Sequence, residues 1–117
     1  MVTASLATIP TREHPETRSP RALIVSRLDD TKMPPAFVKE LLAWRSDRWT
    51  IDVLGGAYYP YGRDLLAKLK KHPCVRVLDP VAPAAMPDLY REYDALLATG
   101  LIEGGSYALC EAAAGPA

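Results

Sequence analysis

Four short apolar runs, separated by stretches with helical spacing, limit the possible folds of this chain more than any other feature of its sequence. The runs cover residues 22–25, 49–54, 75–78 and 95–98. The first of them, at 22–25, is apolar throughout, which is typical of a strand that is buried on both faces of a sheet. Neighbouring parallel strands have to be joined by crossovers, which are usually helices. The alternation therefore predicts the α/β class, with a parallel sheet covered by helices.

Four helices are expected between and after these strands. Apolar residues recur at near-helical spacing in these segments, and prolines stand where a first turn tolerates them. The expected helices cover about 34–46, 65–72 and 107–114, and another helix is expected to begin at residues 86–90.

The first twenty residues differ from the rest of the chain. They contain Pro10, Pro15 and Pro20 and show no sustained hydrophobic period, which predicts an irregular lead-in or linker. Residues 21–117 are expected to form one domain, because a chain of 117 residues leaves little room for two separate cores.

The charge balance argues against two broad classes of protein. Fourteen basic and fourteen acidic residues give a formal net charge of zero, unlike the single-sign field of a general nucleic-acid or membrane-surface binder. The sequence also lacks an apolar run of about 18 residues and a signal peptide. A cytoplasmic protein without a nucleic-acid partner is expected, and peripheral membrane contact stays open. Cys74 and Cys110 lie in apolar contexts and are expected to be buried thiols.

Two cations follow the first predicted strand. Ligands of parallel sheets bind outside the carboxyl ends of the strands, and Arg27 and Lys32 lie in the first loop at that edge. Arginine can make a forked contact with phosphate oxygens, whereas lysine offers a point charge. The pair could hold a diphosphate, or it could be a solvated pair neutralised by Asp29 and Asp30.

Two glutamates lie around the start of the last predicted helix. Glu103 precedes the helix and Glu111 lies within it, while Ser106 is the candidate N-cap. Gly104 and Gly105 allow a ligand to approach the backbone, and the free N–H groups of the helix favour an anion. Both glutamates could instead be ordinary surface acids. The small and apolar neighbours of Glu111 favour a partner or a ligand for its carboxylate.

These segments together resemble a known family. Residues 103–112 are similar to the E-x7-E motif of retaining GT-B glycosyltransferases (glycosyltransferase group 1, or family 4-like). Three further segments resemble that family in the same order, namely 25–28 with Lys32, 51–55, and 75–78 with 86–90 and 93–95. The resemblance implies a Rossmann-like, nucleotide-sugar-binding domain, which is the C-terminal, donor-binding half of a GT-B architecture.

The resemblance also implies roles for individual residues. Arg27 and Lys32 would hold the diphosphate and stabilise its charge as it leaves, and Glu103 would lie against the transferred sugar. Glu111 would bind the ribose hydroxyls. Donor-binding backbone is implied at Gly55, Gly104, Gly105 and Ser106.

A GT-B enzyme has a second Rossmann-like domain, which binds the acceptor, and a final strand after the motif. Neither is expected in this sequence, so the resemblance predicts a domain that is incomplete at its C-terminus. Such a fragment would bind a nucleotide diphosphate sugar and would transfer no sugar by itself. The acceptor, the base and the sugar are not identified. Expected partners are a missing N-terminal domain or a second copy that pairs with the open sheet edge.

Two other functions remain open: a non-catalytic α/β interaction module, and a fragment of a sugar-nucleotide epimerase. The tyrosines at 58, 59 and 61 could stack on a base, but a surface or interdomain loop is preferred. No cofactor is expected. His14 and His72 lack the spacing of metal ligands, so no metal site is predicted.

Overall fold

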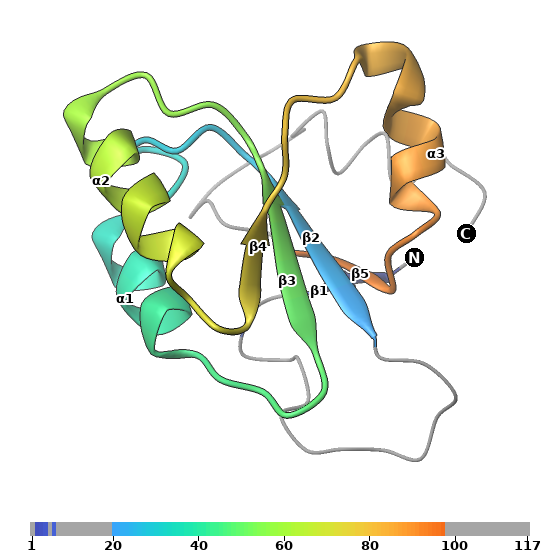
Figure 1. The fold of residues 1–117 in the computed structure, drawn as a ribbon, viewed down its shortest axis with the longest axis horizontal. Coiled ribbons are helices and arrows are strands. Elements are labelled where there is room, and N and C mark those ends of the chain that lie inside the picture. The colour runs from blue at the N-terminus through green and yellow to red at the C-terminus, as the bar shows by residue number, and fades with distance from the viewer. Residues whose placement is uncertain (1, 5, 7–19, 98–117) are drawn as a thin grey trace.

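A computed structural model describes residues 2–4, 6 and 20–97. Its five strands are all parallel and form one sheet in the order β1-β5-β2-β3-β4 (Figure 1). The strands are β1 (Val2–Ala4), β2 (Arg21–Val25), β3 (Thr50–Leu54), β4 (Val75–Val77) and β5 (Ala95–Leu97). The predicted α/β class and the Rossmann-like sheet are confirmed.

Helices cover the two faces of the sheet unequally. The longer helices, α1 (Pro35–Ala43) and α2 (Pro60–Lys70), lie on one side. A 3-10 turn, η2 (Pro83–Ala85), leads into the short helix α3 (Met86–Tyr90) on the other side (Figure 1). Prolines near the start of each helix fit a position whose N–H has no helical acceptor.

Helix α1 ends earlier than the sequence predicts, at Ala43 instead of about Ser46. Trp44 has extended backbone angles, and its side chain packs into the core. The Ser46 hydroxyl then accepts the backbone N–H groups of Arg48 and Trp49, at 3.2 and 2.9 Å. A serine that binds nearby backbone favours a turn over a further helical turn, which explains the shorter helix.

Side-chain alternation along the strands builds two separate cores. In β2, Ala22 and Ile24 belong to the core under α1 and α2, whereas Leu23 belongs to the core under α3. Such alternation follows from the two-residue period of a strand. Among the described residues, the core under α1 and α2 is the larger one and the core under α3 is the smaller.

The first strand is a departure from the predicted irregular lead-in. Val2 pairs with Ala95 and Ala4 pairs with Leu97, so β1 occupies the edge position beside β5. A further strand after β5 would take this position in a doubly wound sheet. Leu6 is also buried and packs into the core under α1 and α2. Residues 7–19 and 98–117, including the predicted fourth helix, lie outside the described residues.

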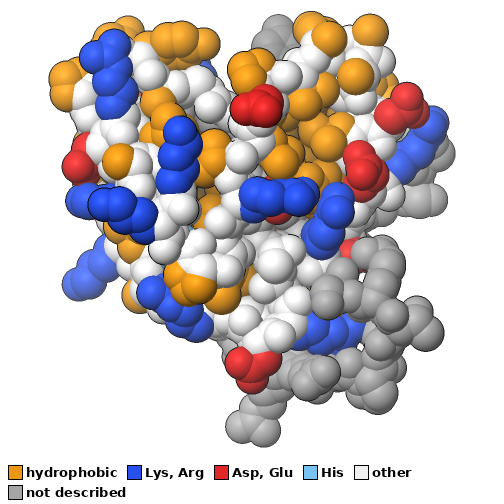
Figure 2. Space-filling model, in the orientation of Figure 1, with side chains coloured by type: hydrophobic (Ala, Val, Ile, Leu, Met, Phe, Trp, Pro, Cys, Tyr) orange, Lys and Arg blue, Asp and Glu red, His pale blue; other side chains and the backbone are white. Residues whose placement is uncertain are grey.

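The face that carries α3 is chemically mixed. Figure 2 shows hydrophobic side chains gathered around α3, with Lys and Arg side chains along the lower border of this area. The core under α3 includes half-buried residues, among them Leu78, Val81 and Leu89. No helix in the described residues is both long enough and apolar enough to cross a membrane.

Candidate functional site

The strand order creates a topological switch point between β2 and β5, at the carboxyl ends of the strands. The chain passes from β2 outward through β3 to β4, and β5 then returns to the opposite side of β2. Ligands of open α/β sheets bind where this reversal leaves a crevice outside the carboxyl ends of the strands. The loop that follows β2 begins at Ser26 and lies at this point.

Backbone contacts hold the loop after β2 against the loop after β3. The N–H of Ser26 donates to the carbonyl of Leu54 at 3.0 Å, and the N–H of Leu28 donates to the carbonyl of Gly56 at 2.9 Å. A Cβ atom on Gly55 would lie 1.6 Å from the carbonyl oxygen of Ser26. Only glycine permits such a close approach, so Gly55 is required here by the packing of the two loops.

Asp29 organises the remainder of the loop. Its Oδ1 accepts the backbone N–H groups of Thr31 and Lys32, at 3.0 and 2.8 Å, and its Oδ2 lies 3.4 Å from Nε of Arg27. An aspartate that binds backbone two and three residues ahead fixes a turn. The predicted neutralising pair therefore exists for Arg27, and the same carboxylate also shapes the segment that carries Lys32.

The structure brings three of the predicted site residues to one edge. Arg27 and Lys32 share the loop after β2, and Gly55 packs directly against that loop. The Arg27 side chain is 64% exposed, so its guanidinium is accessible to an anion. The other predicted site residues lie outside the described residues, namely Glu103, Gly104, Gly105, Ser106 and Glu111.

No model of a protein family and no curated protein sequence matches this chain. The structure itself supports an α/β, Rossmann-like fold.

The tyrosines beside this edge differ in their environment. Tyr58 and Tyr59 are exposed, as expected for a surface loop. Tyr61 instead donates its hydroxyl to the carbonyl of Met33 at 2.6 Å, which ties α2 to the loop after β2. Burial, followed by the nearby charge of Asp30, raises the pKa of Tyr61.

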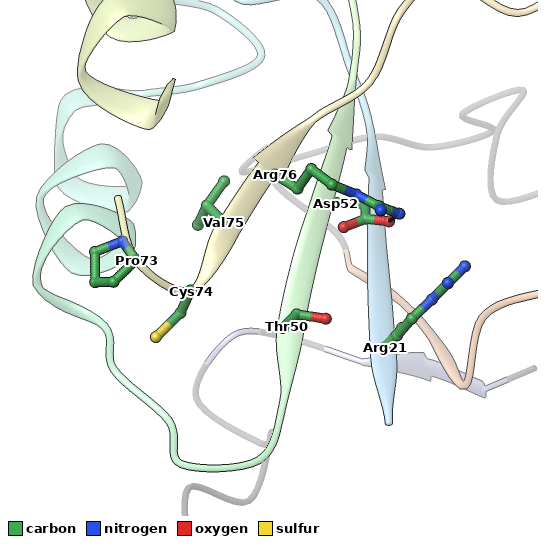
Figure 3. Close-up of a pocket in the computed structure, with 7 residues that line it drawn as sticks. All are labelled: Arg21, Thr50, Asp52, Pro73, Cys74, Val75 and Arg76. Carbon is green, nitrogen blue, oxygen red and sulfur yellow. Dashed lines mark hydrogen bonds and ion pairs between the residues drawn. The ribbon is translucent and has the colours of Figure 1, made fainter. Parts of the chain in front are cut away.

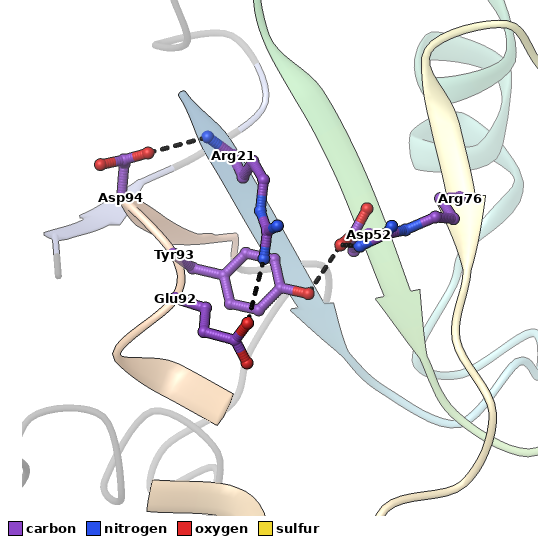
Figure 4. A network of polar contacts seen from close by, with 6 residues as sticks. All are labelled: Arg21, Asp52, Arg76, Glu92, Tyr93 and Asp94. Atoms are coloured by element: carbon purple, nitrogen blue, oxygen red, sulfur yellow. Dashed lines mark hydrogen bonds and ion pairs between the residues drawn. The ribbon is translucent and has the colours of Figure 1, made fainter. Parts of the chain in front are cut away.

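A second polar cluster, which the sequence analysis missed, lies on the face of the sheet that carries α3. Asp52 is 1% exposed in the middle of β3. Its Oδ2 accepts the Tyr93 hydroxyl and Nη2 of Arg76, each at 2.6 Å (Figure 4). A buried carboxylate requires such partners. An acid within an otherwise apolar strand was the available signal, although it does not name its partners.

Arg21 extends this cluster to the start of β5. Its guanidinium carbon lies 4.8 Å from the centre of the Tyr93 ring, and its Nη2 lies 3.7 Å from a Glu92 oxygen. Its backbone N–H donates to Asp94 Oδ2 at 2.8 Å, while the Asp94 N–H donates back to the Arg21 carbonyl at 2.7 Å. These contacts join β2 to the segment before β5.

The environment of Asp52 changes the acid–base properties of its partners. Burial, and then the hydrogen bond to Asp52, raises the pKa of Tyr93 to about 12. The hydrogen bond to Asp52 also raises the pKa of Arg76. At neutral pH the tyrosine is therefore a neutral donor and the arginine a cation, as a buried carboxylate needs.

His72 is a separate buried group beneath the sheet. Its Nδ1 accepts the backbone N–H of Cys74 at 3.0 Å, and its Nε2 lies 3.1 Å from the carbonyl oxygen of Leu41 and 2.9 Å from Nη1 of Arg45. Burial, and then the charge of Arg45, lowers the pKa of His72. Both nitrogens thus serve to connect α1, α2 and β4 as a neutral ring.

Proposed function

We propose that the carboxyl edge of the sheet binds the diphosphate of a nucleotide sugar, and that the domain is the donor-binding part of a retaining GT-B glycosyltransferase. The observation that carries this proposal is the position of Arg27, Lys32 and Gly55 at one edge beside the switch point. Anionic ligands of Rossmann-like sheets bind at this edge. The order of the sequence motifs supports the same assignment.

In the proposed complex, the loop after β2 supplies the charge. The exposed guanidinium of Arg27 offers a forked contact to phosphate oxygens, and Lys32 adds a point charge from the same loop. Fixed cations stabilise the negative charge that grows on a departing diphosphate. Glu103 and Glu111 take the sugar and ribose contacts that the resemblance assigns to them. In the proposed enzyme, a second Rossmann-like domain binds the acceptor.

Calorimetric titration with UDP, GDP and ADP tests the proposal. Arg27→Met should weaken the binding of the preferred diphosphate about tenfold, which corresponds to roughly 1.4 kcal/mol. Arg91→Met provides the matched control, because Arg91 is also an exposed, ion-paired arginine but lies after α3. Glu111→Ala should weaken the binding of the nucleotides but leave the affinity for pyrophosphate unchanged, because pyrophosphate lacks a ribose.

A variant that is expected to bind the diphosphate more tightly provides a second test of the proposal. Asp29→Asn keeps an oxygen for the N–H groups of Thr31 and Lys32 but removes the charge that faces Arg27. It should strengthen diphosphate binding several-fold, and Asp30→Asn should have a smaller effect. No binding of any of the three nucleotides at millimolar concentration would contradict the proposal and would favour the non-catalytic interaction module.

A further inference from the structure

A cavity of about 170 Å³ opens at the opposite edge of the sheet, near the amino ends of three strands. Arg21, Thr50 and Val75 are the first residues of β2, β3 and β4, and all three line the cavity (Figure 3). The proposed donor site lies at the carboxyl ends of the same strands. The cavity is therefore separated from that site by the length of the sheet.

Two arginines line this cavity, one from each of the two strands that neighbour β3. Arg21 comes from β2 and Arg76 from β4, and their guanidinium groups both project over the sheet face beside Asp52 (Figure 3). Arginine has five N–H donors in a rigid fork and favours phosphate and carboxylate oxygens. A pair of such forks on one cavity is suited to a ligand with several acceptor oxygens.

The protein holds both guanidinium groups in position before any ligand arrives. Arg76 is fixed by its 2.6 Å contact with Asp52, and Arg21 is placed over the ring of Tyr93. Side chains that are already ordered lose little conformational entropy on binding. These contacts occupy only some of the five N–H donors of each guanidinium group. Within the part of the chain that the structure describes, Nε of Arg21 is buried and has no hydrogen-bond partner.

The neighbouring acids leave room for an added anion. Asp52 also lines the cavity, where its Oδ2 already accepts from both Tyr93 and Arg76. Asp94 accepts the backbone N–H of Arg21. Glu92 is 59% exposed and lies 3.7 Å from Arg21. Exposed pairs at this distance are weak and are screened by solvent, so a bound oxyanion can compete with Glu92 for the guanidinium.

From this arrangement we infer that the cavity is a binding site for a small tetrahedral oxyanion, either inorganic phosphate or the phosphate group of a monoester. The anion bridges the guanidinium groups of Arg21 and Arg76, and the Thr50 hydroxyl donates to a third oxygen. A phosphate can receive donors from several directions at once, whereas a carboxylate offers two oxygens in one plane. This site is independent of the proposed nucleotide site.

A nitrogen–proton NMR titration locates the binding. Potassium phosphate, methyl phosphate and acetate are added to the full chain at constant ionic strength, and the amide shifts of Thr50, Cys74 and Arg76 are followed. Both phosphates should move these amides with a saturable dependence, and acetate should bind at least tenfold more weakly. Tighter binding of methyl phosphate identifies a monoester as the ligand, and tighter binding of inorganic phosphate identifies the free ion.

Two variants test the role of the arginines. Arg21→Gln keeps the backbone pairing with Asp94 and should weaken phosphate at least tenfold. Arg76→Lys keeps a positive charge for Asp52, so the fold is preserved. It loses the forked donors of the guanidinium group and should weaken the binding of phosphate several-fold. Arg27→Gln is the control and should leave these amide shifts unchanged. Unchanged affinity in Arg21→Gln, shifts confined to residues 26–33, or equal binding of acetate would each overturn the inference.

Discussion

Asp52 illustrates how one side chain can connect parts of the sequence that are far apart. Its carboxylate is almost inaccessible to solvent and is reached by Tyr93 from before β5 and by Arg76 from β4. Breaking a buried pair leaves an unsatisfied charge, which costs more than the pair itself contributes. The cluster thus stabilises the order of the central strands while it also positions Arg76.

At this scale we predict a pH-dependent contribution from Tyr93. The folded-state pKa of about 12 lies above the ordinary value of 10.0, so the stabilisation is complete below pH 10 and is lost as the pH rises through 12. Tyr93→Phe should lower the free energy of unfolding by about 1–3 kcal/mol at pH 8. Urea unfolding measures this loss, and Tyr58→Phe should change nothing because Tyr58 is exposed.

Phenolate absorbance gives a second readout of the same residue. The difference between the wild-type and Tyr93→Phe titrations should appear near pH 12. A difference that titrates near pH 10, or equal stability of the two proteins at pH 8, would show that the hydrogen bond to Asp52 does not hold the phenol neutral.

The strands and helices differ in how well the sequence predicts them. The strands at 21–25, 50–54, 75–77 and 95–97 lie within one residue of the predicted segments, because most of their residues are apolar or β-branched and favour a buried strand. Strand β1 was not predicted. It has three residues, and its partner β5 lies far along the chain, so no local pattern announces it. The predicted end of α1 was wrong because the side chain of Trp44 packs into the core, and this tertiary contact cannot be read from the local sequence.

The sequence predicts the part of the candidate site that follows from the parallel arrangement of the strands. Arg27 and Gly55 come directly after predicted strands, and parallel strands place such residues at the same edge. Asp29 was expected only to neutralise charge. Its backbone contacts within the loop depend on the local fold of the turn. The Asp52 cluster could not be predicted because Arg76 in β4 and Tyr93 before β5 are brought to Asp52 by a strand order that the sequence does not state.

At the scale of one element, helix α2 provides a test of packing against helix propensity. Alanine normally stabilises a helix relative to glycine by about 1 kcal/mol. A Cβ on Gly62 would, however, lie 1.9 Å from the carbonyl oxygen of Leu28. Gly62→Ala should therefore destabilise the protein by about 1–3 kcal/mol, as measured by urea unfolding, and should displace the loop that carries Arg27.

The reverse change at an exposed position of α2 serves as the control. Ala67→Gly should cost about 1 kcal/mol through helix propensity alone and leave nucleotide binding unchanged. Stabilisation by Gly62→Ala would mean that α2 can move away from the loop after β2 without cost.

For the molecule as a whole, β1 and Leu6 make the N-terminal segment part of the fold. Leu6 is 6% exposed and lies in the same core as residues of α1, α2 and the four strands β2 to β5. Leu6→Ala should lower the free energy of unfolding by roughly 2–5 kcal/mol, as for other buried leucines. Urea unfolding measures the loss, and Leu66→Ala, at a half-buried leucine of α2, should cost less.

Removal of residues 1–6 extends this prediction. The carbonyl and N–H groups of β5 that pair with β1 would then be exposed at the sheet edge, and exposed edges pair with other chains. Light scattering should show association of the shortened protein that the wild type lacks at equal concentration. A truncated protein that stays as stable and as monomeric as the wild type would show that β1 is dispensable.

The pairing of β1 with β5 also has a consequence for the order of assembly. Val2 and Ala95 are 93 residues apart, whereas β2 and β3 are joined through the single crossover of α1. Closing a longer loop costs more chain entropy, and contacts between distant residues slow folding. We expect the four strands from β2 to β5 to associate first and β1 to join late, so β1 pairs last although it precedes the other four strands in the chain.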